Sequence, residues 1–345
     1  MTKLILVSPG FPADENDSAA VPYLQDYCLH LLKKVPAENI NIVSTQYPYT
    51  PKPYLWNGIQ VYPIGGKNRK GIYQLINHIK TKKRLKSIVG KEPAVIHAFW
   101  LSDAAMSASS FAAKRKLPCL VTLMGQDAKA GNPYFKLVSK HVAFTSLCNF
   151  QANVFRNDYQ TVVKAVIPLP LPSIDLRPVI SRSIDLLFVG SYIQVKQPLQ
   201  FIEIVAEIKK KHSGVRAVMI GGGPLLAEIN SRVVALHLQD HIVVLESINR
   251  DEVFEYMQRS KILVHTSSFE GQCNVYGEAL LCGMHVLSYN VGYIADSPKH
   301  IVCADKNEFV LKIMQLLLHP INFTPVRSID DEQCINAYLN LYGMS

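Results

Sequence analysis

Two glutamates, Glu270 and Glu278, stand eight residues apart in the segment SSFEGQCNVYGEALLCG and could serve two ends of one ligand. The segment follows a strand-like stretch and enters a helix-like one, which places Glu270 on a loop at the carboxyl edge of a sheet. Such a loop directs backbone N–H groups toward an anion. Carboxylates accept hydrogen bonds from vicinal hydroxyls, which suits a sugar and a ribose. The alternative is structural, since a carboxylate near a helix N-terminus commonly caps the helix.

The elements that must position this pair alternate between strand and helix along the whole chain. The first half reads as KLILVS, PYLQDYCLHLLKKV, NINIVST, IQVYPI, a basic helix over 72–89, AVIHAFW, AAMSASSFAAKRK and CLVTLMG. The second half reads as IDLLFVGS, PLQFIEIVAEIKKKH, VRAVMIGGGP, PLLAEINSRVVALHL, HIVVLES, RDEVFEYMQRS, KILVHTS, YGEALLCG and HVLSYN. This order predicts an α/β protein whose mostly parallel sheets meet ligands at the carboxyl ends of their strands.

The chain of 345 residues is long enough for two hydrophobic cores. The stretch IPLPLPSIDLRPVISRS holds four prolines and no periodicity, which is typical of an interdomain linker. We therefore predict two doubly wound Rossmann-like domains facing across a cleft. The predicted boundaries are 1–168 for the N-terminal domain, 169–183 for the linker, 184–325 for the C-terminal domain and 326–345 for a helix that returns to the first domain.

Composition narrows the class of protein further. No apolar run approaches the roughly 18 residues that a membrane-spanning helix needs, and no signal peptide is visible. The seven cysteines are scattered and never spaced as CxxC, so we expect free thiols in a reducing cytoplasm and no structural zinc. Residues 1–168 hold 21 Lys and Arg against 9 Asp and Glu, whereas the rest holds 15 against 18. The basic surplus of the first half favours an anionic partner.

The glutamate segment resembles the Glu-x7-Glu signature of the retaining glycosyltransferases of family 4, whose fold is GT-B. The matching positions are Glu270, Gly271, Asn274, Val275, Glu278, Ala279, Cys282 and Gly283. The resemblance implies that Glu270 positions or stabilises the donor sugar and that Glu278 holds the ribose.

Two further segments resemble the donor-binding half of that family. In LLFVGSYIQVKQ, Lys196 matches the lysine that meets the donor diphosphate, whereas Ser191 stands where an arginine is usual. The turn GGGP resembles the family's Gly-x-Gly-Pro turn, and main-chain groups near Ile248 would meet the nucleobase. A Rossmann dinucleotide site would need a glycine where Leu226 stands. The predicted donor-binding residues are Gly190, Ser191, Lys196, Gly222, Ile248, Gly271, Gln272, Cys273, Asn274 and Glu278, with Glu270 catalytic.

The N-terminal half matches the family less closely. VIHAFW and LVTLMGQDAK resemble its His-Ala-x-Trp strand end and its Thr-x-His-Gly-x-Asp turn, but Met124 replaces the turn histidine. His97, Asp127 and Asn16 are the residues predicted for the acceptor side. For His97, the alternative of a hydrogen-bonded structural histidine stays open.

The resemblance implies transfer of a sugar, with retention, from a nucleotide diphosphate sugar to a glycan or lipid-linked acceptor in cell-surface polysaccharide or lipopolysaccharide synthesis. The resemblance also implies that neither a metal nor another cofactor takes part, and the absence of an Asp-x-Asp triplet agrees with this expectation. Positive groups and helix N-termini would stabilise the departing diphosphate. Met124 and Ser191 keep open the alternative of a catalytically silent sugar-nucleotide-binding protein.

The basic helix admits two interpretations. Ile72, Leu75, Ile76 and Ile79 form one apolar stripe, and basic residues crowd the following turns. The stripe either packs into the core beneath a solvated basic face, or the helix docks on an anionic membrane surface. We expect a cytoplasmic protein, peripheral on the inner face of the membrane in the second case, and no nucleic-acid partner, since no recognition module is visible. The basic residues are Lys80, Lys82, Lys83, Arg84 and Lys86.

Overall fold

The structure is a computed structural model that describes residues 2–138, 140–174 and 181–344. The chain divides into two compact units, which we name unit 1 (Met1–Leu171 with Asp330–Ser345) and unit 2 (Pro172–Ile329). It passes from unit 1 to unit 2 inside the segment 169–183 predicted as the linker, of which residues 175–180 lie outside the described residues.

Unit 1 is built on an eight-stranded sheet with the order β3-β4-β2-β1-β5-β6-β7-β8. Its strands pair in parallel except β3 and β4, which pair antiparallel. Asn57 and Gly58 join these two, with φ values of 45° and 80° that suit a tight hairpin turn. The strands are β1 (Lys3–Gly10), β2 (Ile40–Tyr47), β3 (Tyr54–Trp56), β4 (Ile59–Pro63), β5 (Ala94–Phe99), β6 (Cys119–Thr122), β7 (Ala143–Ser146) and β8 (Ala165–Val166).

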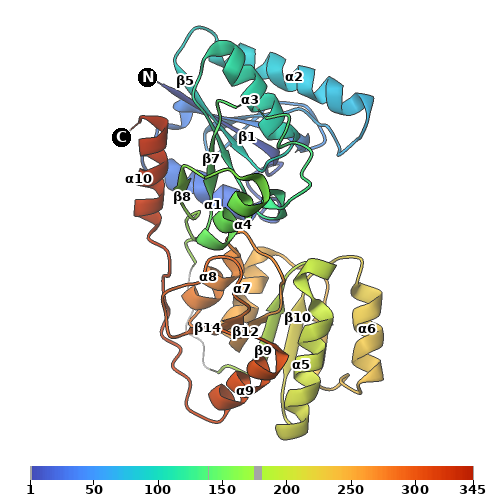
Figure 1. Ribbon diagram of the computed structural model, residues 1–345. Coiled ribbons are helices and arrows are strands. Elements are labelled where there is room, and N and C mark those ends of the chain that lie inside the picture. The colour runs from blue at the N-terminus through green and yellow to red at the C-terminus, as the bar shows by residue number, and fades with distance from the viewer. Residues whose placement is uncertain (1, 139, 175–180, 345) are drawn as a thin grey trace. The chain divides into compact units, whose positions relative to one another are not determined.

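Helices cover both faces of this sheet. On one face α2 and α3 lie side by side and enclose one core with the inward side chains of the strands (Figure 1). On the other face α1 packs against α10, so the last helix of the described chain belongs to unit 1. The helices are α1 (Pro22–Leu31), α2 (Ile72–Val89), α3 (Asp103–Arg115), α4 (Asn149–Tyr159) and α10 (Asp331–Tyr342), with short 3-10 turns η1 (Ala37–Asn39) and η2 (Gln126–Ala128).

Unit 2 is built on a six-stranded, fully parallel sheet with the order β11-β10-β9-β12-β13-β14. Alternate strand residues face two cores: Leu186 and Phe188 face one and Leu187 faces the other. The strands are β9 (Ile184–Val189), β10 (Ala217–Ile220), β11 (Ile242–Leu245), β12 (Ser260–His265), β13 (His285–Ser288) and β14 (His300–Val302).

The helices of unit 2 fall into two groups that match the two cores. Residues of α5, α6 and α9 line one core, and residues of α7 and α8 line the other. These elements are α5 (Pro198–Lys211), α6 (Leu226–Ala235), α7 (Arg250–Gln258), α8 (Asn274–Leu281), α9 (Lys306–Leu317) and the 3-10 turn η3 (Gln194–Lys196).

The predicted α/β class with two doubly wound sheets is confirmed, and so is the return of the C-terminal helix to the first unit. Among the described residues, no helix combines the length and the apolar character needed to cross a bilayer.

Candidate functional site

Unit 2 has a topological switch point between β9 and β12. The chain leaves β9 for β10 on one side of it and later returns to β12 on the other. Loops that leave the carboxyl ends of two such strands diverge, and the space between them is the usual ligand site of doubly wound sheets. The loop after β9 carries Lys196 in η3, and the loop after β12 carries Glu270.

The two loops bring Lys196 and Glu270 into direct contact. The Lys196 Nζ lies 2.5 Å from the Glu270 Oε1, and both side chains are largely buried. The Thr266 hydroxyl lies within hydrogen-bond distance of the Lys196 and Gln197 carbonyl oxygens (3.0 and 2.9 Å), and the Ser268 N–H donates to the Val195 carbonyl (2.9 Å). The Thr266 side chain and a backbone hydrogen bond therefore join the two loops independently of the ion pair.

The ion pair decides the charge state of both partners. Burial is the largest single influence on Glu270 and would raise its pKa, but the Lys196 ammonium together with the neighbouring hydrogen-bonding groups holds that pKa below its ordinary value. Burial would likewise lower the pKa of Lys196, yet the Glu270 carboxylate raises it. Both groups are thus charged at neutral pH, and the site offers a fixed cation beside a fixed carboxylate.

Glu278 forms a second pair, with a partner that the sequence analysis missed. Arg250, the first residue of α7, donates from Nη2 to the Glu278 Oε1 at 2.8 Å, and both side chains are mostly buried. Asn249 caps α7 in a capping box with Glu252. A cation in the first turn of a helix is disfavoured by the helix dipole. The sequence pattern of an arginine directly after an N-cap could therefore have indicated a nearby carboxylate that stabilises it.

His265 is a second residue that the sequence analysis missed. It ends β12, is buried, and places its Nε2 3.5 Å from the Glu270 Oε1 and 3.3 Å from the Cys273 Sγ. Its Nδ1 lies 3.3 Å from the Tyr276 hydroxyl. Burial lowers the pKa of His265 to about 3, so the ring is neutral and lies behind the carboxylate as a hydrogen-bonding group.

Within the part of the chain that the structure describes, one group of potential metal ligands lies close enough together to hold an ion. It consists of His265, Glu270 and Cys273. Their ligand atoms lie within 4.8 Å of one another. The Lys196 ammonium, however, already provides a cation at the Glu270 carboxylate, and burial raises the pKa of the Cys273 thiol well above its ordinary range. A metal would have to compete with Lys196 and to deprotonate a buried thiol.

The glycine turn after β10 approaches the loop after β9 very closely. A Cβ at Gly221 would lie 2.0 Å from the Gly190 carbonyl oxygen, and one at Gly222 would lie 2.8 Å from the Ser247 Oγ. The Tyr192 N–H donates to the Gly222 carbonyl at 2.8 Å. At Gly221 the close atom belongs to the backbone, so only glycine allows this approach to the loop that leads to Lys196.

The structure gathers all the residues predicted for the donor on one edge of the unit 2 sheet. They lie on the loops that leave the carboxyl ends of β9, β10, β11 and β12, or in α8, which follows. Ser191 is exposed, and Ile248 is partly buried beside α7. The set comprises Gly190, Ser191, Lys196, Gly222, Ile248, Glu270, Gly271, Gln272, Cys273, Asn274 and Glu278.

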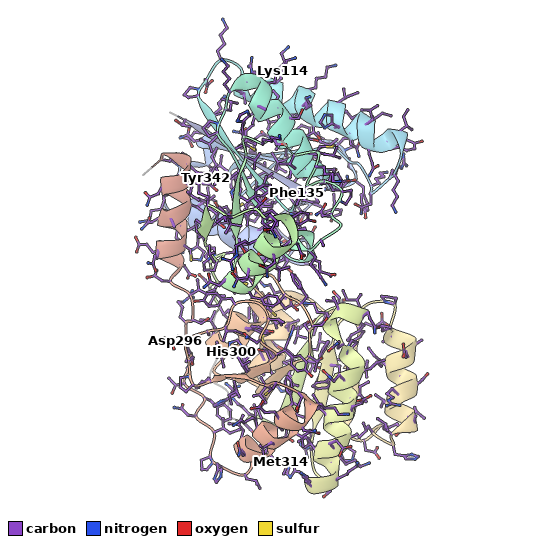
Figure 2. The ribbon with its side chains drawn as sticks, in the orientation of Figure 1. Lys114, Phe135, Asp296, His300, Met314 and Tyr342 are labelled. Atoms are coloured by element: carbon purple, nitrogen blue, oxygen red, sulfur yellow. The ribbon has the colours of Figure 1, made fainter. Side chains whose placement is uncertain are left out.

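Of the residues predicted for the acceptor side, all in unit 1, His97 is placed in the core. It is completely buried; its Nε2 lies 2.7 Å from the Thr122 Oγ1 and its Nδ1 lies 2.5 Å from the Tyr342 hydroxyl. Figure 2 labels Tyr342, the last residue of α10. Burial lowers its pKa to about 3, so it is neutral. The structure thus agrees with the alternative of a structural histidine.

Asp127 lies in the 3-10 turn η2 after β6, and Asn16 lies in the loop after β1. The Asp127 carboxylate accepts hydrogen bonds from the N–H groups of Leu101, Met124 and Gly125 at 2.6–3.2 Å. It therefore holds its own turn together. Asn16 is exposed on the loop after β1.

Comparison with known proteins relates unit 2 to one family. Residues 178–322 match the family described as Glycosyl transferases group 1. The gpi3 subunit of phosphatidylinositol N-acetylglucosaminyltransferase from Schizosaccharomyces pombe is 33% identical over 101 residues, 29% of this chain and 22% of that protein. The Vi polysaccharide biosynthesis protein VipC/TviE of Salmonella typhi is 31% identical over 109 residues, 32% of this chain and 18% of that protein. The matched stretch spans less than a quarter of either relative.

Solved structures extend the likeness of the fold to the whole chain. Sucrose-phosphate synthase from Thermosynechococcus elongatus superimposes with a TM-score of 0.73 at 14% identity, over 99% of this chain and 95% of that one. The Anabaena protein Alr3699/HepE, solved with UDP and glucose, superimposes with a TM-score of 0.68 at 11% identity, over 99% and 98%. Both units therefore have the Rossmann-like architecture of the GT-B fold, and the match of residues 178–322 makes this part of the chain similar to the glycosyl transferases group 1 family.

Proposed function

We propose that this protein is a retaining glycosyltransferase that moves a sugar from a nucleotide diphosphate sugar to a glycan or lipid-linked acceptor. The observation that carries the proposal is the pairing of Lys196 with Glu270 and of Arg250 with Glu278 at the switch point of the matched domain. The role in cell-surface polysaccharide or lipopolysaccharide synthesis, on the cytoplasmic side, is part of the proposal.

Each charged group has a distinct proposed role. Lys196 faces the donor diphosphate and offsets the negative charge that grows on it as the bond to the sugar breaks. Glu270 positions the sugar and stabilises positive charge at the anomeric carbon. Glu278, held by Arg250, accepts hydrogen bonds from the ribose hydroxyls.

No metal takes part in this proposal. The cation that the leaving diphosphate requires is Lys196, which is fixed by its ion pair before the donor arrives. The N–H groups at the start of α8 add a partial positive charge directed at an anion. Chelating agents should accordingly leave the transfer rate unchanged.

A catalytically silent protein that binds a sugar nucleotide is the second candidate. It is favoured by Met124, which replaces the family's turn histidine, and by Ser191, which replaces a phosphate-binding arginine. Both candidates require the donor site of unit 2, and only the first requires turnover.

A thermal-shift screen over nucleoside diphosphates and their sugar conjugates tests the proposal. A ligand present at about 100 times its Kd stabilises the folded state by about 2.7 kcal/mol, which corresponds to a rise in Tm of about 5–10 °C for a domain of this size. We expect one base to stand out. No response to any of these ligands would overturn both candidates. Binding without transfer or donor hydrolysis, whatever acceptor is supplied, would favour the silent protein.

A further inference from the structure

Helix α2 exposes a row of large aliphatic side chains, whose contact with water is unfavourable. Ile72, Leu75, Ile76 and Ile79 expose 68%, 56%, 39% and 56% of their surfaces. At spacings of three and four residues they occupy one face of the helix. The first interpretation of this stripe, packing into the core, is wrong.

The helix is instead anchored to unit 1 through its opposite face. The residues that it buries are Asn77, Thr81, Leu85, Ile88 and Val89. The anchoring is strongest near the C-terminal end, where the last three join the core shared with α3. The exposed row therefore belongs to a helix that is already held in place.

Basic residues surround this row without acidic neighbours in the sequence. Between Glu38 and Glu92 the chain has ten Lys and Arg and no Asp or Glu. Lys67, Arg69 and Lys70 are exposed just before α2, and five basic residues follow the row. Among the described residues, no carboxylate pairs with Lys80, Lys83 or Lys86. The positive charge is therefore available to an outside partner.

A pocket opens beside the exposed row. It has a volume of about 380 Å³ and is lined by Lys80, Lys83, Arg84 and Ser87 of α2 together with Pro51 and Pro63. The Arg84 guanidinium lies over the Tyr62 ring, 4.8 Å from its centroid, which holds it in position. Three cations and a hydroxyl, without a carboxylate, suit a phosphate group.

We propose that α2 docks unit 1 on an anionic phospholipid bilayer, with Ile72, Leu75, Ile76 and Ile79 among the acyl chains and the pocket of Lys80, Lys83 and Arg84 around a headgroup phosphate. An amphipathic helix lies in the bilayer interface when an apolar face and basic flanks coincide, as they do here. The inference does not depend on the proposed function, because it concerns a surface of unit 1 and not the donor site of unit 2.

Two other occupants fit the surface less well. A second copy of this chain would bring two basic surfaces together, and like charges repel. A nucleic acid would satisfy the lysines, but it would leave four exposed aliphatic side chains in water. A bilayer satisfies both kinds of residue at once.

Sedimentation of the full chain with vesicles tests the proposal. Vesicles of phosphatidylcholine alone are compared with vesicles of equal parts phosphatidylcholine and phosphatidylglycerol. We expect at least about tenfold more binding to the acidic vesicles, and less binding as salt rises. Equal binding to both vesicle types, or no binding, would overturn the proposal.

Two triple variants separate the contributions of charge and apolar contact. The basic variant, which should abolish vesicle binding, combines Lys80→Glu, Lys83→Glu and Arg84→Glu. Its control makes an equal change of charge on α5 and should leave binding unchanged. The control combines Lys209→Glu, Lys210→Glu and Lys211→Glu. Ile72→Ser with Leu75→Ser and Ile79→Ser should lower binding about tenfold. Its control changes three comparably exposed residues of unit 2, Val234, Val243 and Leu311, to serine.

The apolar triple variant decides between a membrane and another polyanion. Its substituted side chains are exposed, so a circular-dichroism melt should match that of the unmodified chain. If it bound acidic vesicles as well as the unmodified chain, the membrane proposal would fail. Binding to a single-stranded RNA homopolymer, lost only in the basic triple variant and without vesicle binding, would indicate a nucleic-acid surface instead.

Discussion

Two buried histidines lie on matching strands of the two units and have opposite surroundings. His97 lies on β5 and His265 on β12, and each of these strands adjoins the central strand across a switch point. His97 lies between the hydroxyls of Thr122 and Tyr342, whereas His265 lies behind the charged Glu270. The same topology thus supports a neutral core in one unit and a charged candidate site in the other.

The difference arises from what covers each histidine. In unit 1, α10 brings Tyr338 and Tyr342 onto His97, and Tyr338 stacks on the imidazole at 5.4 Å between centroids. In unit 2, the loop after β12 places Glu270 and Cys273 beside His265. A doubly wound sheet therefore provides a location for chemistry, and the segments laid over its edge decide whether the location is used.

If the charged groups of unit 2 set it apart from unit 1, the largest loss of activity is expected on substitution of Glu270. Glu270→Gln keeps a hydrogen-bonding partner for Lys196 but removes the negative charge, so we expect sugar transfer to fall about 1000-fold. Binding of the nucleoside diphosphate should persist, as measured by calorimetry. Asp185→Asn is the matched control, since Asp185 pairs with Lys261 (2.7 Å) near the amino ends of the same two strands. If Glu270→Gln retained full activity, the charge at the switch point of unit 2 would have no role in sugar transfer.

A smaller effect is expected at the other end of the ion pair. Lys196→Met removes the cation proposed to meet the diphosphate, and a lost charge-assisted hydrogen bond of about 3 kcal/mol weakens binding about 100-fold. The Kd of the nucleoside diphosphate, measured by calorimetry, reports this directly. Lys261→Met removes a lysine of the same sheet and should leave that Kd unchanged. Equal Kd values for the two variants would contradict the role of Lys196.

The smallest predicted effect is a pH dependence of the free energy of unfolding, to which both His97 and His265 contribute. The pKa of each is lowered to about 3 in the folded protein, whereas an unfolded histidine titrates near 6.5. Between these values the unfolded state binds more protons, so the free energy of unfolding falls as pH decreases below about 6.5. Each histidine contributes at most about 1.4 kcal/mol per pH unit to that slope.

Substitution separates the two histidines. His97→Gln and His265→Gln should each reduce the pH dependence of the unfolding free energy, measured with urea between pH 6 and pH 5, by about 1 kcal/mol. Only His265→Gln should also change the affinity for the donor, because only His265 contacts Glu270. An unchanged slope in either variant would show that its histidine is protonated in the folded protein.

The sequence predicted the elements better than it predicted their contacts. The basic helix was expected over 72–89 and is found at Ile72–Val89, because helical periodicity is a local property. The contact between Lys196 and Glu270 spans 74 residues and depends on the parallel pairing of β9 with β12. No local pattern contains that pairing, and only the resemblance to a family suggested that both residues serve one site.

The sequence did not predict two features of the structure: the residues that contact the two glutamates, and the face of α2 that is buried. His265 and Arg250 contact the predicted glutamates, but each belongs to a different element and neither forms part of the resemblance. On α2, two apolar faces competed, and periodicity could not tell which one the sheet would cover. The face that includes Leu85 and Ile88 was buried, and the face that includes Ile72 and Ile79 was left in solvent.

The return of α10 to unit 1 has a consequence for the order in which the protein matures. Unit 2 is one uninterrupted stretch, Pro172–Ile329, whereas unit 1 is made of two stretches that flank it. During synthesis, the ribosome delivers all of unit 2 before the tyrosines that cover His97. Domains made in sequence usually fold in that order. Here unit 1 emerges first, but its core cannot be completed until α10 has been made, so unit 2 is free to fold before unit 1 is complete.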